Sequence, residues 1–172
     1  MVNLPSWPPV AIWQKEKRSD LELTKTLLAA LGSPHKKLPP TIHIAGTNGK
    51  GSTVAILKSI FETAGYKVHS YTSPHLLEFN ERINLAGKNI SDHHLFELLE
   101  QVRIKAEELN LEPGFFEGTT IAAFLAFASI SADILILETG LGGRLDCTNV
   151  IESPILTIIT PISFDHMEHL GN

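Results

Sequence analysis

The stretch that decides the fold runs from Thr41 to Ser52 and reads TIHIAGTNGKGS. Its first part, residues 41–45, is a short run rich in β-branched side chains, which predicts a buried strand. The glycine-rich loop 46–51 follows. Over residues 52–64 apolar side chains recur at helical spacing, and Gly65 ends this predicted helix. A glycine-rich loop between a strand and a helix is the context that a phosphate-binding loop requires.

The chemistry expected of this loop follows from its residue types. Glycines let backbone N–H groups turn inward, and the N-terminus of the helix adds its positive dipole. Lys50 can reach terminal phosphates and the Ser52 hydroxyl can bind magnesium. The spacing differs from the common GxxxxGK[ST] pattern, so a glycine turn with an unrelated lysine is the alternative. The predicted ATP-binding residues are Gly46, Thr47, Asn48, Gly49, Lys50, Gly51 and Ser52.

The rest of the chain alternates between helical and strand patterns. Further helices are predicted over 21–31, 91–109 and 119–130, with Ser91 as the cap of the second, and further strands over 67–71, 133–138 and 155–160. The connection 72–90 shows no clear period. Strands that are apolar on both faces and alternate with helices predict an α/β fold with a mainly parallel sheet flanked by helices.

Composition narrows the class of protein. Of the 172 residues, 43% are hydrophobic and 19% are charged, which fits one globular domain. The net charge of -5 argues against a surface that grips nucleic acid or an anionic membrane. The longest apolar run, 121–130, is too short to span a bilayer. Cys147 is the single cysteine, so no disulfide can form within the chain and a cytoplasmic location is expected.

Polar residues follow the predicted strands at the edge where ligands of parallel sheets collect. Glu138 ends one strand and could hold magnesium, or it could be an ordinary acid exposed to water. Arg144, Asp146 and Asn149 could contact a substrate or satisfy their own loop. The segment 165–171 is rich in histidine, and from spacing alone a solvated loop explains it better than a metal site. Cys147 has no assignable base, so a reduced thiol in a loop is expected rather than a nucleophile.

Four stretches together resemble one family. They are HIAGTNGKGS (43–52), TSPHLLEFNERI (72–83), ETGLGGRLDCTN (138–149) and DHMEHLG (165–171), and their order and spacing are similar to those of the folylpolyglutamate synthase/dihydrofolate synthase family. The phosphate loop alone is shared with the wider Mur-ligase superfamily, whereas the second and third stretches are much more specific. The resemblance covers nearly the whole chain.

The resemblance implies a Mur-ligase-like, P-loop ATP-binding domain that is incomplete at its C-terminus. Residues 1–172 would be the N-terminal/central domain, with the C-terminal glutamate-ligase domain absent. It also implies an ATP- and Mg²⁺-dependent ligase that adds L-glutamate to a folate or dihydropteroate carboxylate through an acyl phosphate. A separate C-terminal half could be a partner.

The family's functional residues can be placed on matching positions. The catalytic residues would be Lys50, Glu138 and His166, and the metal ligands Ser52, Ser73, Glu138 and His166. The substrate-binding residues would be Phe115, Phe116, Glu117, Leu145, Asp146 and Cys147. Residues 79–83 correspond to a mobile loop near the folate. Cys147 stands where the family usually has alanine, and a thiol is small enough to fit there.

Two other functions stay open at this point. A Mur-type ligase that adds amino acids to a cell-wall precursor would keep the chemistry and change the substrate. A non-catalytic nucleotide-binding chain that needs a partner would keep only the loop. The specific stretches 72–83 and 138–149 favour the folate ligase over the Mur-type ligase.

Overall fold

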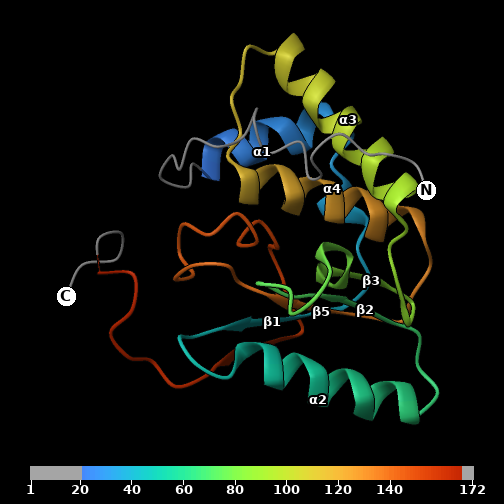
Figure 1. Cartoon of the computed structure of the whole chain (residues 1–172), viewed down its shortest axis with the longest axis vertical. Coiled ribbons are helices and arrows are strands. Elements are labelled where there is room, and N and C mark those ends of the chain that lie inside the picture. The colour runs from blue at the N-terminus through green and yellow to red at the C-terminus, as the bar shows by residue number, and fades with distance from the viewer. Residues whose placement is uncertain (1–20, 168–172) are drawn as a thin grey trace.

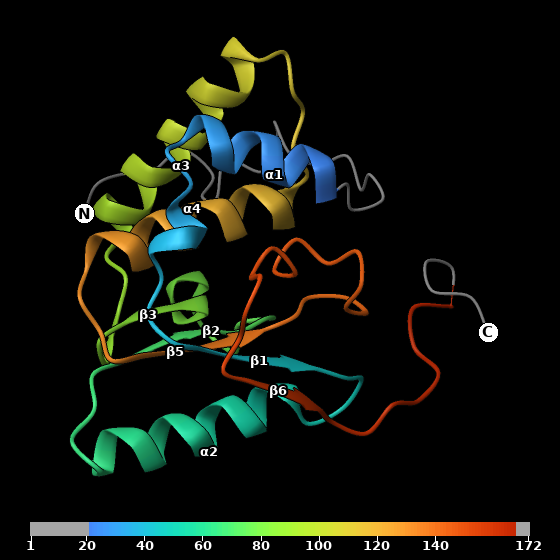
Figure 2. The same ribbon diagram turned by 180° about the vertical axis from the view of Figure 1, so that it is seen from behind.

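The computed structural model describes residues 21–167, which form a six-stranded sheet between helices (Figures 1 and 2). The spatial order is β4-β3-β2-β5-β1-β6. The strands are β1 (Thr41–Ala45), β2 (Val68–Tyr71), β3 (Ile83–Leu85), β4 (Lys88–Asn89), β5 (Ile134–Glu138) and β6 (Leu156–Ile159). Strands β2, β5, β1 and β6 are parallel, and β3 and β4 add an antiparallel edge. The predicted fold class is confirmed.

Helices cover both faces of the sheet. The helices α1 (Leu21–Ala30), α3 (Asp92–Glu108) and α4 (Phe115–Ser129) lie on one face, and α2 (Lys50–Thr63) lies on the opposite face (Figure 1). The larger apolar core lies on the three-helix side and includes Phe124 and Phe127 of α4. A smaller core on the α2 side joins Val54 to strand residues such as Ile44 and Ile136. Because β5 is buried along its whole length, its continuous apolar pattern is explained.

The connection 72–90 is more structured than its sequence suggests. It contains a 3₁₀ helix, η2 (Phe79–Arg82), and the hairpin of β3 and β4. Its turn residues Ala86 and Gly87 both have positive φ, at 50° and 91°, as a type I′ hairpin turn requires. Alanine rarely occupies such a turn, and strands of two or three residues are too short to show a period. The absence of a clear period in the sequence is thus explained by the shortness of these elements.

Two helices begin earlier than predicted. Helix α4 begins at Phe115 rather than Thr119, and its N-cap residue, Gly114, makes no side-chain capping bond. Helix α2 begins at Lys50 rather than Ser52, after Gly49 in the left-handed conformation at φ 86°. Neither start carries a capping side chain, so neither gives the usual signal in the sequence. By contrast, Ser91 caps α3 as predicted by accepting a hydrogen bond from the His94 N–H.

Strand β6 forms one edge of the described sheet (Figure 2). It pairs with β1 along one side, and its side chains Leu156 and Ile159 are exposed. Across residues 21–167, no helix is both long enough and apolar enough to cross a membrane.

Candidate functional site

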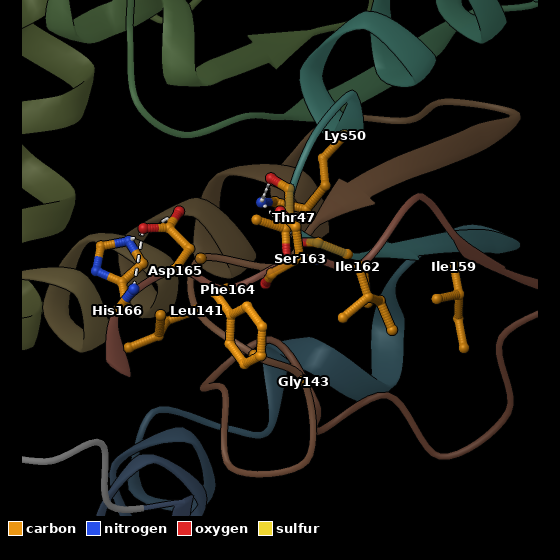
Figure 3. Close-up of a pocket in the computed structure, with 14 residues that line it drawn as sticks. Thr47, Lys50, Leu141, Gly143, Ile159, Ile162, Ser163, Phe164, Asp165 and His166 are labelled. Carbon is orange, nitrogen blue, oxygen red and sulfur yellow. Dashed lines mark hydrogen bonds and ion pairs between the residues drawn. The ribbon is translucent and has the colours of Figure 1, made fainter. Parts of the chain in front are cut away.

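Three loops meet where β1, β5 and β6 end, and they enclose a pocket of about 620 Å³ (Figure 3). The phosphate loop contributes Gly46, Thr47 and Lys50, and the glycine-rich turn after β5 contributes residues 140–143. The segment after β6 contributes residues 162–166. Ligands of parallel sheets bind at this edge, and the pocket lies at the edge that the sequence predicts for the site.

The second half of the phosphate loop is the start of α2. Thr53 donates its N–H to Gly49 O at 2.9 Å, so the N–H groups of residues 50–52 stand at the open end of the helix. Lys50 folds back over the loop, and its Nζ donates to Gly46 O at 3.0 Å and to Thr47 O at 3.4 Å (Figure 3). A cation above a helix N-terminus is the arrangement that binds phosphate.

The first half of the loop is used differently. The N–H groups of Thr47 and Asn48 both donate to Pro161 O, at 3.1 and 3.3 Å. Gly46 lies against Thr160, where an added Cβ would meet that residue's hydroxyl and its carbonyl oxygen. The predicted ATP-binding set is thus divided. Residues 46–48 hold a neighbouring segment of the chain, while residues 49–52 present the helix start.

Glu138 lies beside this helix start. Its side chain is buried at the end of β5, and Oε2 is 3.7 Å from the position that a Cβ on Gly51 would occupy. The same oxygen accepts the Ser73 N–H at 3.2 Å. Burial raises the pKa of the Glu138 carboxyl to about 7, although the Ser73 N–H and the charge of Lys50 act in the opposite direction. The alternative of a water-exposed acid is therefore wrong, because the carboxylate faces the loop.

A divalent cation fits this carboxylate. Desolvation disfavours the Glu138 anion, and a bound cation would offset that penalty. Within residues 21–167, no group of three or more His, Cys, Asp or Glu side chains could hold a metal ion. Magnesium suits such a sparse set because it keeps waters and takes phosphate oxygens as ligands, with one or two protein carboxylates. Ser73 adjoins Glu138 through its main chain, and Ser52 is exposed on the first turn of α2.

His166 lies on the pocket, next to Asp165 (Figure 3). The ring nitrogen Nε2 of His166 is 3.8 Å from Asp165 Oδ2, and the main-chain N–H of His166 donates to Asp165 Oδ1 at 2.9 Å. In Figure 3 this pair lies at the opposite end of the pocket from Ile159. Residues 168–171 of the histidine-rich segment lie outside the described residues. The structure thus brings His166 and Lys50 to the same cavity.

Asp146 organises the turn that forms the pocket's wall. Its Oδ2 accepts the N–H groups of Gly140 and Leu141, at 3.0 and 2.8 Å, and its Oδ1 accepts the Thr148 N–H and hydroxyl. The Thr148 hydroxyl oxygen also lies 2.9 Å from His43 Nε2 on β1. Of the two roles predicted for Asp146, the structure therefore displays the one in which the carboxylate satisfies its own loop.

Cys147 is fully buried, and only the neighbouring Leu145 of this predicted substrate segment is exposed. The Cys147 thiol lies 3.2 Å from Thr120 Oγ1 and 3.9 Å from Phe116 O, both on α4. Burial raises the pKa of this thiol well above its ordinary value. The prediction that it is no nucleophile is consistent with this environment, and the thiol lies in a turn, as expected, although that turn is buried.

The first turn of α4 carries the other predicted substrate residues. Phe115 lies 5.6 Å from the Arg82 guanidinium, which also lies 5.1 Å from the Phe79 ring. The Phe116 ring packs directly on Gly140. Glu117 is buried in the first turn of the helix, where an acid is favoured by the dipole. The segments 79–83 and 115–117, which are separated in sequence, thus meet in the fold.

Sequence reasoning missed the segment 160–163. Thr160 bonds to Ala45 O through its N–H at 2.8 Å, and Ser163 bonds to both Thr47 and Asn48. Arg82 lies within the predicted segment 79–83 but was given no role of its own, and its guanidinium joins the Phe79 and Phe115 rings. Nothing in the local sequence marks residues 160–163, because their role depends on β6 lying next to β1.

Comparison with known proteins identifies the family. No family model matches the chain. A curated relative, the dihydrofolate synthase/folylpolyglutamate synthase of Bacillus subtilis, is 50% identical over 153 residues, which cover 86% of this chain and 35% of the relative. The chain thus spans about a third of that relative's length.

Solved structures agree. The structure of Escherichia coli FolC in complex with DHPP and ADP has a TM-score of 0.84 and 35% identity, and the match covers 92% of this chain and 38% of that one. A bifunctional folylpolyglutamate synthase/dihydrofolate synthase with Mn, AMPPNP and L-glutamate bound has a TM-score of 0.81 and 35% identity, covering 91% and 38%. With its sequence, its sheet and its phosphate loop in agreement, the chain belongs to the folylpolyglutamate synthase/dihydrofolate synthase family, whose N-terminal region it matches.

Proposed function

We propose that this chain is the nucleotide-binding part of an ATP- and Mg²⁺-dependent ligase that adds L-glutamate to a folate or dihydropteroate carboxylate. The observation that carries the proposal is the buried Glu138 carboxylate beside the start of α2, with Lys50 above the same loop. The relatives' structures hold ADP or AMPPNP, and one also holds Mn and L-glutamate. A cytoplasmic location belongs to the same proposal, and so does the assignment of residues 1–172 to one partial ATP-binding domain.

The reaction gives each group a physical task. A carboxylate is a poor electrophile because oxide would have to leave, so the γ-phosphoryl group of ATP is first transferred to it. The glutamate amine then attacks the acyl carbon, and phosphate departs with the electrons of the broken bond. Lys50 and the N–H groups at the start of α2 would hold the nucleotide phosphates. Glu138, with Ser73, Ser52 and His166, would hold magnesium, which supplies charge neutralisation when it is bound.

The pterin side of the substrate would lie near the first turn of α4 and the turn 145–147. Phe115 and the exposed Leu145 offer apolar contacts for a planar ring system. Phe116, Glu117, Asp146 and Cys147 would act by shaping the wall behind it, since these side chains pack on or bond to the surrounding turns.

The proposal is tested by binding before turnover. Calorimetry of the purified chain should detect AMPPNP binding that strengthens with Mg²⁺, and a dihydropteroate or folate titration should give a second, separate signal. If the chain binds AMPPNP neither in the presence nor in the absence of Mg²⁺, the assignment is contradicted. Binding of a cell-wall nucleotide precursor in place of the folate would favour the Mur-type ligase instead.

A second candidate is favoured by the edge of the sheet. The exposed Leu156 and Ile159 on β6 suit a covering partner, and the relatives are far longer than this chain. On this second proposal the chain binds nucleotide but does not catalyse the reaction by itself. Catalysis would require that β6 be covered by the C-terminal portion found in the relatives, either in the same chain or in a separate one. Turnover assays with and without a separately expressed C-terminal half of a relative decide between the two candidates.

A further inference from the structure

The first half of the phosphate loop is bonded to the segment that follows β6. Besides the two N–H bonds to Pro161 O, the Thr47 hydroxyl donates to Ser163 O and accepts the Ser163 N–H, both at 3.1 Å. The Asn48 side-chain amide donates to Ser163 Oγ at 3.0 Å. These five hydrogen bonds between residues 47–48 and 161–163 are called the loop clamp below.

The loop clamp is the main attachment that the structure gives this segment at the pocket. Ile162 and Phe164 are 77% and 80% exposed, so apolar burial contributes little to holding residues 161–164. Hydrogen bonds must then fix the direction of the chain. Figure 3 shows Ser163 directly beneath Thr47, with Phe164 leading to Asp165 and His166.

The bonds that form the clamp come from groups that a phosphate would otherwise use. Thr47 and Asn48 each use the main-chain N–H group and the side chain to form hydrogen bonds with residues 161–163. The clamped residue Ser163 is close to His166 in the sequence, because only Phe164 and Asp165 lie between them. A restraint at Ser163 therefore limits where the imidazole can lie relative to Lys50.

We propose that Thr47 and Asn48 are positioning residues, which hold His166 over the pocket through the loop clamp rather than contacting the nucleotide. This inference rests on the proposed function, because it assigns the clamp the task of placing His166 for a metal–nucleotide ligand. It changes the expected role of two residues that the motif alone assigns to ATP.

The test compares Thr47→Val with a matched control, Thr53→Val. Both variants remove one threonine hydroxyl near the start of α2, but the Thr53 hydroxyl donates to Gly49 O within its own turn. Asn48→Ala serves as a second clamp variant. Hydrogen–deuterium exchange of the peptide covering 161–167 reports the clamp without any ligand. Electron paramagnetic resonance of Mn²⁺ with saturating AMPPNP reports the metal, and calorimetry without metal reports the nucleotide alone.

Thr47→Val removes the two clamp hydrogen bonds that the hydroxyl makes. We expect faster exchange over 161–167 and an Mn²⁺ affinity that is weaker by at least roughly two- to tenfold. Metal-free AMPPNP affinity should match the wild type, and Thr53→Val should match it in all three measurements. In a His166→Ala background, Thr47→Val should cause no further loss of Mn²⁺ affinity. Thermal unfolding of each variant verifies that the chain is folded.

Three results overturn the inference. Unchanged exchange in both clamp variants removes the clamp, and an equal loss of affinity with and without Mn²⁺ makes Thr47 a nucleotide contact. A loss of Mn²⁺ affinity that persists in the His166→Ala background shows that the effect does not pass through His166. Wild-type chain that binds no AMPPNP contradicts the proposed function instead, and the exchange measurement still decides whether the clamp exists.

Discussion

The Ser73 N–H donates to Glu138 Oε2 at 3.2 Å, which fastens the turn after β2 to the carboxylate at the end of β5. The two strands are parallel neighbours, so their C-terminal ends share one edge of the sheet. The bond uses the main chain of Ser73 and leaves its hydroxyl for another partner. The same oxygen faces the start of α2, 3.7 Å from the position that a Cβ on Gly51 would occupy. One carboxylate therefore joins two of the stretches that the family resemblance singled out.

Glu138→Gln should separate function from stability. The amide cannot neutralise a divalent cation, so Mg²⁺ should no longer strengthen AMPPNP binding, as calorimetry would measure.

The folded-state pKa of Glu138 is raised from 4.5 to about 7, so the wild type loses stability as pH rises through that window. The amide does not ionise, and the variant should therefore be more stable than wild type at pH 8, by up to about 3 kcal/mol. The difference should vanish near pH 4.5.

Urea unfolding at pH 5 and pH 8 measures this difference. Glu152→Gln, at an exposed acid 3.5 Å from Lys36, is the control and should show little change between the two pH values. A Glu138→Gln variant that is less stable than wild type at pH 8 would mean that the ionised carboxylate is well compensated in the folded chain.

Lys50→Ala should remove nucleotide binding while sparing the fold. Lys50 Nζ contacts two carbonyl oxygens of its own loop, and the loss of these half-exposed bonds should cost about 1 kcal/mol or less. The loss of a charged phosphate contact should weaken AMPPNP binding at least tenfold, or about 1.4 kcal/mol. Lys58→Ala, two turns along the same helix, is the matched control. Equal AMPPNP affinity in the two variants would show that Lys50 does not contact the nucleotide. In any active form of the protein, Lys50→Ala should abolish nucleotide turnover.

Gly46→Ala should disrupt the junction of β1 and β6. Gly46 has φ 134°, and an added Cβ would meet the Thr160 hydroxyl and lie 2.8 Å from the Thr160 carbonyl oxygen. Since Thr160 is bonded to Ala45 O, the two segments cannot separate without losing that bond. We expect a loss of more than about 2 kcal/mol in urea unfolding.

Gly65→Ala is the control for this variant. Gly65 also has positive φ, at 90°, but an added Cβ would have no neighbour within 4 Å. Its cost should be about 1 kcal/mol, which reflects backbone strain alone. Similar losses in the two variants would show that the contact with Thr160 relaxes without penalty.

The sequence predicts the elements whose pattern is local. Strand β1, its loop and α2 follow from residues adjacent in the chain, and the continuous apolar run of β5 predicts a strand buried on both faces. The hairpin of β3 and β4 does not follow, because Ala86 is an unusual turn residue. The clamp at Ser163 does not follow either, since it depends on which strand lies beside β1. Burial of Cys147 likewise depends on packing against α4.

The Cys147 thiol offers a probe of how the chain opens. It is the single cysteine, it is fully buried, and its raised pKa leaves little thiolate at neutral pH. A thiol reagent such as DTNB should therefore react with the native chain only when α4 separates from the turn 145–148. We expect a native rate at least about a hundredfold below the rate in 6 M urea, because local opening costs several kcal/mol in a packed core. Cys147→Ala should change the free energy of unfolding by about 1 kcal/mol or less, since a single side-chain atom is lost. A native rate equal to the unfolded rate would place the thiol at the surface, and the wall of the pocket would then be mobile where the structure packs it against Thr120.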